Sequence, residues 1–136
     1  MTRTVKKLPL LFLIGAIIYP IIEILYRGYT HFSMAILGGV CFCSLFLIDK
    51  GLGPGKLLLK AFLSAIVITQ LEFLCGVLVN LVLNLSVWDY SDRAFNILGQ
   101  VCPLFSFYWF ILCLFVLSTL SFEKEISQRK TLTMDS

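Results

Sequence analysis

The sequence predicts an all-α membrane protein, a polytopic bundle of four transmembrane helices with both termini in the cytoplasm. Of its 136 residues, 59% are hydrophobic and only 14% are charged, whereas soluble domains are about one quarter charged. Four long apolar segments alternate with short polar connections. Lys and Arg concentrate in alternate connections, which predicts an orientation. We therefore expect a single integral membrane domain over residues 1–136.

The first apolar segment, residues 8–26, follows the basic stretch "TRTVKK". A run of about 20 apolar residues crosses the hydrocarbon core as a helix. A signal peptide also begins with basic and then apolar residues, but "YPIIEILY" follows here without a small-residue cleavage site, so we expect an uncleaved helix. Glu23 and Arg27 share its outer face at a spacing of four, either as a local ion pair or as part of a functional site.

The second apolar segment, residues 32–48, is the shortest, so it predicts either a thin or tilted spanning helix or a re-entrant segment. Gly38 and Gly39 predict close packing against another helix. The connection "DKGLGPGK" is rich in Gly and Pro, which predicts a flexible inner turn. It lacks the GxxxxGK[ST] spacing of a phosphate-binding loop, so any ATPase would be a separate chain.

The third apolar segment, residues 57–85, is the longest and carries Glu72 just past its middle. A charge at mid-bilayer costs roughly 3 kcal/mol or more, so such residues usually face the protein interior or a watery cavity. Glu72 belongs to a polar stripe with spacings of three or four, which must face inward: Thr69, Glu72, Gly76, Asn80 and Asn84. The stripe indicates either hydrogen-bonded helix contacts or the wall of an outward-facing polar cavity.

The outer loop, residues 86–100, interrupts the apolar second half with "SVWDYSDRAFNILGQ". Trp88 and Tyr90 are expected to anchor at the outer interface, where amphipathic rings are common. Asp89 and Ser91 predict capping of a short interfacial helix through "DRAFNIL". The loop is interpreted as a lid over the polar stripe, and the alternative is a solvated turn with aromatic anchors.

The charged residues of this loop are expected either to stay in water or to pair with the charges beneath them. The loop charges are Asp89, Asp92 and Arg93, and the charges beneath are Glu23, Arg27 and Glu72.

The fourth apolar segment, residues 101–122, has Pro103 in its first turn, where proline is tolerated. The tail "FEKEISQRKTLTMDS" predicts a short helical extension that frays. Along the whole chain, the five polar stretches carry three, one, three, one and three Lys or Arg residues. Nine of the eleven thus lie on one side of a four-span model, which predicts that both termini and "DKGLGPGK" face the cytoplasm.

The sequence offers little support for catalysis or metal binding. The five cysteines lie mostly in apolar segments, where thiols behave as small hydrophobic groups. Cys41 and Cys43 are two residues apart and point to different helix faces, and the single histidine, His31, lies in an outer loop. No nucleophile with a matched base is visible. We expect no cofactor, no metal, no nucleic-acid partner and no enzymatic activity.

Two stretches of the chain resemble a known family. They are "IIEILYRGYTHFSMAILGGVCF" and "LEFLCGVLVNLVLNLSVWDYSDRAFNILGQVCPLFSFYW". Both are similar to small bacterial membrane proteins of the putative ABC-transporter permease family, type IV or CmpB-like, over roughly residues 8–122. The Trp-Asp-Tyr-Ser element is the most specific part. The family pattern matches Glu23, Arg27, Glu72, Trp88, Asp89, Tyr90, Ser91, Asn96 and Gly99.

From this resemblance and the polar stripe we expect a small permease-like protein that binds a polar or lipid-like ligand from the outer side. It would lie in the cell membrane of a bacterium or be encoded by a phage, and form a homo-oligomer or bind other membrane proteins. The alternatives are an interaction or assembly protein without transport activity, and a phage-type holin. The candidate ligand or polar-network residues are Glu23, Arg27, Glu72, Asn80, Asn84, Trp88, Asp89, Tyr90, Ser91, Asp92, Arg93 and Asn96.

Overall fold

The computed structural model describes residues 2–134, and these residues form an all-helical bundle. Its elements in chain order are α1 (Thr2–Arg27), α2 (Phe32–Leu52), α3 (Leu57–Gly76), the π-helix η1 (Val77–Val82) and α4 (Pro103–Met134). Four helical segments are long and apolar enough to cross a membrane: Thr4–Arg27, Phe32–Leu52, Leu57–Val82 and Pro103–Met134. The predicted all-α architecture, with four helices long and apolar enough to span a membrane, is confirmed.

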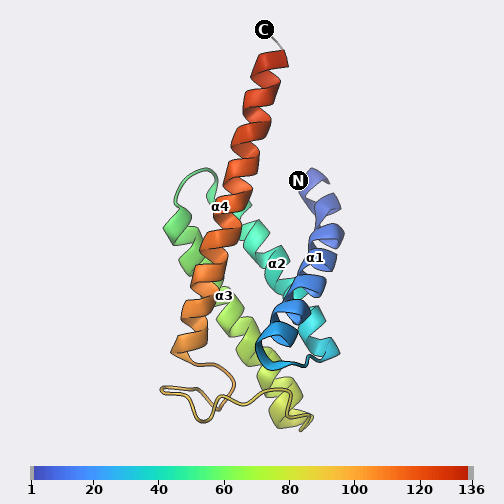
Figure 1. The fold of residues 1–136 in the computed structure, drawn as a ribbon, viewed down its shortest axis with the longest axis vertical. Coiled ribbons are helices and arrows are strands. Elements are labelled where there is room, and N and C mark those ends of the chain that lie inside the picture. Colours follow the sequence, from blue (N-terminus) through green and yellow to red (C-terminus); the bar gives the residue numbers. More distant parts are fainter. Residues whose placement is uncertain (1, 135–136) are drawn as a thin grey trace.

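The helices pack as two pairs (Figure 1). α1 lies against α2, α4 lies against α3, and α2 joins the pairs through α3. α1 and α4 do not pack extensively along each other. The space between these two helices contains the candidate functional site.

Glycines allow α1 and α2 to approach closely, as the Gly38 and Gly39 pair predicted. A Cβ added to Gly15 would meet the backbone oxygen of Gly38, and one added to Gly38 would meet the side chain of Tyr19. A Cβ on Gly39 would lie 2.6 Å from the ring of Phe12. Any larger residue at these positions would push the two helices apart.

α2 has 21 residues, which at 1.5 Å per residue is about 31 Å, enough to cross the hydrocarbon core. It continues past the predicted end at residue 48 and stops at Gly53, whose φ of 69° is in the left-handed region that glycine tolerates. As a result Asp49, which the sequence analysis assigned to the inner turn, lies within the helix and is buried.

The chain between η1 and α4 contains no helix, so the predicted interfacial helix through "DRAFNIL" is wrong. Phe95 and Leu98 have φ values of 55° and 52°, which a right-handed helix cannot accommodate. The Asn96 amide donates to the backbone oxygens of Ser91 and Arg93, so local turns replace helical hydrogen bonds. The regular helix also ends before residue 85, because Asn84 and Ser86 adopt left-handed conformations.

The two termini lie at the same end of the bundle as the connection between α2 and α3 (Figure 1). The connection between α1 and α2 and the loop of residues 83–102 lie at the opposite end. The last turns of α4 extend beyond the bundle, and residues 121–134 are exposed.

Candidate functional site

A cavity of about 360 Å³ lies between α1 and α4 at the end of the bundle that holds the loop. We call it the upper cavity, although Figure 1 draws this end of the bundle at the bottom. It combines charged, aromatic and aliphatic side chains: Tyr19, Ile22, Glu23, Tyr26, Arg27, Tyr90, Phe105, Tyr108, Trp109 and Leu112. Tyr26 and Tyr108 are also exposed, at 64% and 48%, so the cavity reaches the surface between the two helices. Two further hollows, one between α3 and α4 and one between α3 and the loop, have no charged residue in their walls.

The charged wall of the upper cavity is the Glu23–Arg27 pair, one turn apart on α1. Nη2 of Arg27 lies 2.5 Å from Oε1 of Glu23, and the Thr30 hydroxyl donates to Oε2 at 2.8 Å. Nη1 of Arg27 donates to the backbone oxygen of Val87 at 2.8 Å, which ties α1 to the loop. The two charges are therefore balanced locally, and the pair helps to hold the loop in place.

Glu72 lies on α3, next to the aromatic residues of the upper cavity, and is 2% exposed. The hydroxyl of Tyr90 donates to its Oε1 at 3.3 Å, and the indole N–H of Trp109 donates to its Oε2 at 3.0 Å. Burial and the nearby Glu72 raise the pKa of Tyr90 well above its usual range, so its phenol keeps the proton that it donates. Two residues of the upper cavity thus cover a buried carboxyl group.

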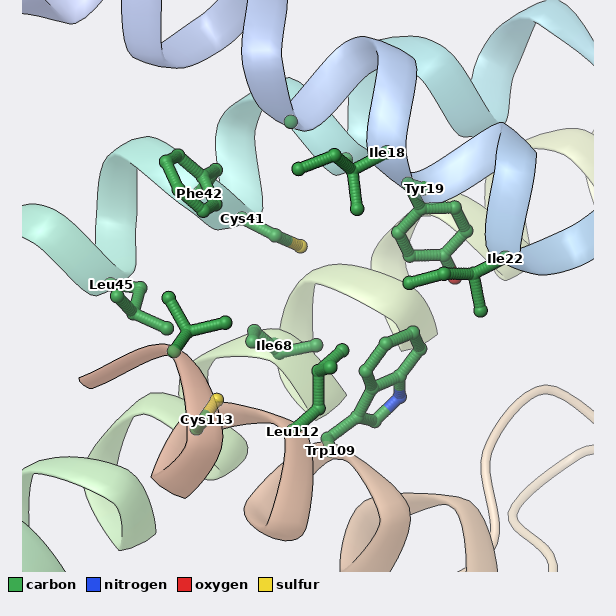
Figure 2. Close-up of a pocket in the computed structure, with 13 residues that line it drawn as sticks. Ile18, Tyr19, Ile22, Cys41, Phe42, Leu45, Ile68, Trp109, Leu112 and Cys113 are labelled. Carbon is green, nitrogen blue, oxygen red and sulfur yellow. The ribbon is translucent and has the colours of Figure 1, made fainter. Parts of the chain in front are cut away.

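A second, apolar cavity of about 80 Å³ adjoins the first deeper in the bundle (Figure 2). We call it the lower cavity. Its walls come from all four α-helices and include Ile18, Phe42, Leu45, Ile68 and Cys113. Both cavities are lined by Tyr19, Ile22, Trp109 and Leu112. Together they form one groove between α1 and α4, with charged residues at the loop end and apolar residues toward the bundle centre.

Aromatic rings make the contacts between α1 and α4 across this groove. Tyr19 stacks on Trp109 with ring centroids 5.3 Å apart, and Tyr26 and Phe105 form a T-shaped pair with centroids 5.9 Å apart. Tyr90 from the loop stacks on Phe105 at 4.4 Å. The two helices therefore meet through side chains that can change rotamer, rather than through close backbone packing.

Other predicted residues fold the loop rather than line the groove. The Asn80 amide donates to Oε1 of Gln100 at 2.8 Å and accepts from the Val87 backbone N–H at 2.6 Å. The indole N–H of Trp88 donates to the backbone oxygen of Gln100 at 2.9 Å. Trp88 is 5% exposed, so the prediction that it anchors at the outer interface is wrong. Its ring instead packs against Gly76, where no Cβ intervenes.

The Asp89–Gly99 part of the loop is organised by its own polar groups. Asp89 accepts hydrogen bonds from the backbone N–H and the hydroxyl of Ser91, which hold the pKa of its carboxyl below the usual range. Asn96 accepts from the Gly99 N–H at 3.0 Å, and Tyr90 N–H donates to the Gly99 oxygen at 2.7 Å. Gly99 has a φ of 71°, and a Cβ there would meet Asp89 and Ser91.

The structure thus separates the predicted residues into three groups. Glu23, Arg27, Tyr90 and the underlying Glu72 lie at the groove. Asn80, Trp88, Asp89, Ser91 and Asn96 fold the loop. Asn84, Asp92 and Arg93 are exposed, and the last two form a surface pair at 3.8 Å instead of reaching the charges beneath.

Sequence reasoning missed the aromatic wall and the residue that joins the loop to α3. Tyr19, Phe105, Tyr108 and Trp109 were treated as apolar or interfacial residues, although Trp109 donates to Glu72. The signal that could have found the three residues of α4 is the number of aromatic residues in "FSFYWF", which lies in the first turns of that helix. Gln100 was missed because it stands at the edge of the apolar fourth segment. Within residues 2–134, no group of three His, Cys, Asp or Glu residues is suited to holding a metal ion.

Comparison with known protein families identifies one that matches most of the chain. The family model described as "Putative ABC-transporter type IV" matches residues 10–131. The chain belongs to this family. The match covers every residue of the groove and of the loop that closes it, so the site lies within the part shared with the type IV family. No curated protein and no solved structure matches the chain.

The type IV family and the four apolar helices both indicate a multi-pass membrane protein of the ABC-transporter type. Such a protein is associated with the lipid bilayer. The resemblance of the chain to this family, expected from the sequence, is confirmed.

Proposed function

We propose that the protein is the membrane component of an ABC-type transport system and takes an amphipathic, lipid-like ligand into the groove between α1 and α4. The observation that carries this proposal is the polarity gradient of the groove. Its upper cavity contains the Glu23–Arg27 pair, whereas its lower cavity is lined by aliphatic, aromatic and thiol side chains. A polar head and an apolar tail would each find matching surroundings.

The entry route in this proposal is sideways from the bilayer. α1 and α4 are held together mainly by the ring pairs Tyr19–Trp109 and Tyr26–Phe105. Rotation of a few aromatic side chains would separate them more easily than a tightly packed helix pair. Ile18 and Tyr108 at the surface are 44% and 48% exposed, so lipid chains would already contact the edge of the groove.

The proposal also assigns a side of the membrane and an energy source. Both termini and the α2–α3 connection lie at one end, and the basic residues of that end favour the cytoplasm. The Glu23–Arg27 end of the groove would then face outward, and the head group would bind near the outer surface. ATP hydrolysis would come from a separate chain, and a homo-oligomer would supply additional helices around the ligand.

The test uses two neighbouring residues of α1. Ile22 lines both cavities, whereas Ile21 is 49% exposed and lines neither. Ile22→Trp should fill the groove and remove bound lipid, and Ile21→Trp should not. Native mass spectrometry of both variants and the wild type, purified in the same mild detergent, would measure the lipid that remains bound. An unchanged lipid complement in Ile22→Trp would contradict the proposal.

An assembly protein is the second candidate, because many polar groups near the site are satisfied internally. Glu72 accepts from Tyr90 and Trp109, and Asn80 bonds Gln100 and Val87. Contacts of this kind hold helices and loops together without any ligand. If Ile22→Trp changes the oligomeric mass and leaves lipid binding unchanged, the groove is a contact surface for another membrane helix, and the assembly function replaces transport.

A further inference from the structure

The upper cavity is unusual in that six of its ten lining residues are aromatic: Tyr19, Tyr26, Tyr90, Phe105, Tyr108 and Trp109. They form two groups, each with rings from both α1 and α4. One is the Tyr19–Trp109 stack. The other surrounds Phe105, which stacks with Tyr90 and meets Tyr26 and Tyr108 edge-on. The faces of aromatic rings carry negative electrostatic potential and attract cations.

The charges around these rings favour a cation over an anion. The one guanidinium of the cavity, Arg27, is already used by Glu23, by the Val87 backbone oxygen and by the ring of Tyr29, 4.7 Å from its carbon. Glu72 has no ion pair among the described residues and receives only the neutral donors Tyr90 and Trp109. The cavity therefore has no unpaired guanidinium for an anion, and a second carboxyl group, Glu72, lies next to its aromatic wall.

Metal ions and cations with N–H groups fit this cavity less well than a cation without N–H groups. A metal ion needs several oxygen or nitrogen ligands, and the oxygens of Glu23 and Glu72 already accept hydrogen bonds or an ion pair. A primary amine or guanidinium would need acceptors for each N–H. A quaternary ammonium has no N–H group, so ring faces and nearby negative charge are sufficient to bind it.

We infer that the upper cavity binds a quaternary ammonium group. The inference rests on the proposed function and deepens it, because this group would be the head of the amphipathic ligand while the lower cavity takes its alkyl tail. The cavity volume of about 360 Å³ falls within the range of small-molecule sites, about 300–1,000 Å³. The ring pairs across the groove would close around the head group, and the carboxyl group of Glu72 would lie behind Tyr90 and Trp109.

The experiment compares short amphiphiles that share one tail. Hexyltrimethylammonium, hexyl sulfate and hexyl glucoside would be titrated into protein purified in dodecyl maltoside, which has neither a charge nor a quaternary nitrogen. Dissociation constants would be measured from the change in tryptophan fluorescence, since one of the two tryptophans, Trp109, lines the groove. The trimethylammonium probe should bind about tenfold more tightly than the other two, the size expected for a partly desolvated cation–π site. Tetramethylammonium serves as the tail-free cation.

Adjacent aromatic residues of α4 provide the matched variants. Tyr108 lines the upper cavity, whereas Phe107 does not. Tyr108→Leu should weaken hexyltrimethylammonium binding severalfold without affecting the glucoside, and Phe107→Leu should leave both unchanged. Tyr26→Leu tests the same wall from α1 and replaces Tyr108→Leu if that variant does not fold.

The outcomes separate this inference from the proposed function. Equal binding of the three heads, lost in Ile22→Trp, overturns the ammonium assignment and leaves the amphiphile groove standing. Tighter binding of the sulfate also overturns it, because Arg27 would then select the head. If tetramethylammonium binds as tightly as the hexyl compound, the cation site stands and the lipid-like ligand is wrong. If no probe binds and Ile22→Trp has no effect on lipid, both proposals fail.

Discussion

Glu72 joins three parts of the chain, because a residue of α3 accepts hydrogen bonds from the loop and from α4. Its two oxygens each have a single neutral donor, Tyr90 or Trp109. An acidic side chain suits this position since both of its oxygens can accept, whereas an amide has only one acceptor. The role of Glu72 in loop closure thus follows from its chemistry, whether or not a ligand is bound.

Glu72→Gln should lower the free energy of unfolding by about 1–3 kcal/mol, because either Tyr90 or Trp109 is left facing an NH₂ group. Thermal unfolding in a fixed detergent, with Glu125→Gln as control, would measure the loss. The side chain of Glu125 is 64% exposed on the extended part of α4, so its substitution should have little effect. Equal melting temperatures for wild type and Glu72→Gln would show that the two hydrogen bonds contribute nothing.

Gly76 is the position of α3 on which Trp88 and Gln100 of the loop pack. A Cβ there would lie 2.5 Å from Oε1 of Gln100 and 2.9 Å from Cζ2 of Trp88. Gly76→Ala should therefore destabilise the protein by about 1–3 kcal/mol through overpacking, despite the better helix propensity of alanine.

Gly51→Ala is the matched control for Gly76→Ala. Gly51 is also helical, and nothing lies within 4 Å of an added Cβ. This change should be neutral or stabilise by up to about 1 kcal/mol. Urea or SDS titrations followed by tryptophan fluorescence would compare the two. A stabilising effect of Gly76→Ala would mean that the loop does not pack on α3 as described.

At the scale of helices, three elements meet through one carboxylate at the end of the bundle opposite the loop. Asp49 of α2 forms two ion pairs. Its Oδ1 lies 2.7 Å from Nζ of Lys60 on α3, and its Oδ2 lies 2.5 Å from Nζ of Lys124 on α4. Asp49 and Lys60 are buried, whereas the Lys124 side chain is 53% exposed. The network fixes the register of three helices at the end where the termini lie.

Asp49→Ala should cost about 3–5 kcal/mol, since it leaves the Lys60 charge buried without a partner. Lys124→Met should cost no more than about 1 kcal/mol, because an exposed ion pair is screened by solvent and Lys60 still neutralises Asp49. Unfolding titrations of the two variants would test the difference. Similar losses in both would place the main contribution on Lys124 and contradict the burial argument.

The helices were predictable from the sequence, but the contacts between them were not. Long apolar segments and alternating basic connections indicate four spans whatever their arrangement. Asp49 was missed because its helix extends one turn beyond the apolar run, and helix ends depend on capping by residues such as Gly53. The shape of the loop was missed because left-handed residues such as Phe95 and Leu98 have no distinct sequence signal.

The candidate site was predictable only in part, because sequence patterns show local features and not contacts between distant residues. The spacing of Glu23 and Arg27 on one helix face is a local feature, and the structure has them in contact. Trp88 was expected at the membrane interface because that is the usual place for its ring, yet Gly76 and Gln100 provide a buried position. Such a position arises from residues that are close in space and distant in sequence, which periodicity does not reveal.

The positions of the chain ends and of the connections between helices predict how the whole molecule is oriented in the membrane. Both termini and the α2–α3 connection lie at one end, and the residue 83–102 loop lies at the other (Figure 1). Nine of the eleven Lys and Arg residues belong to the former end by sequence. Since cytoplasmic connections carry an excess of Lys and Arg, the loop and the charged end of the groove should face outward.

Reporter fusions in a bacterial host would check this orientation. Alkaline phosphatase fused after residue 30 or 92 should be active, because both positions belong to the outer end, and the same enzyme fused after residue 134 should be inactive. A fluorescent protein at residue 134, which folds in the cytoplasm, should give the reverse signal. An active phosphatase at residue 134 would invert the topology. The head-group end of the groove would then face the cytoplasm, and the proposed uptake from the outer side would be wrong even if lipid binding persisted.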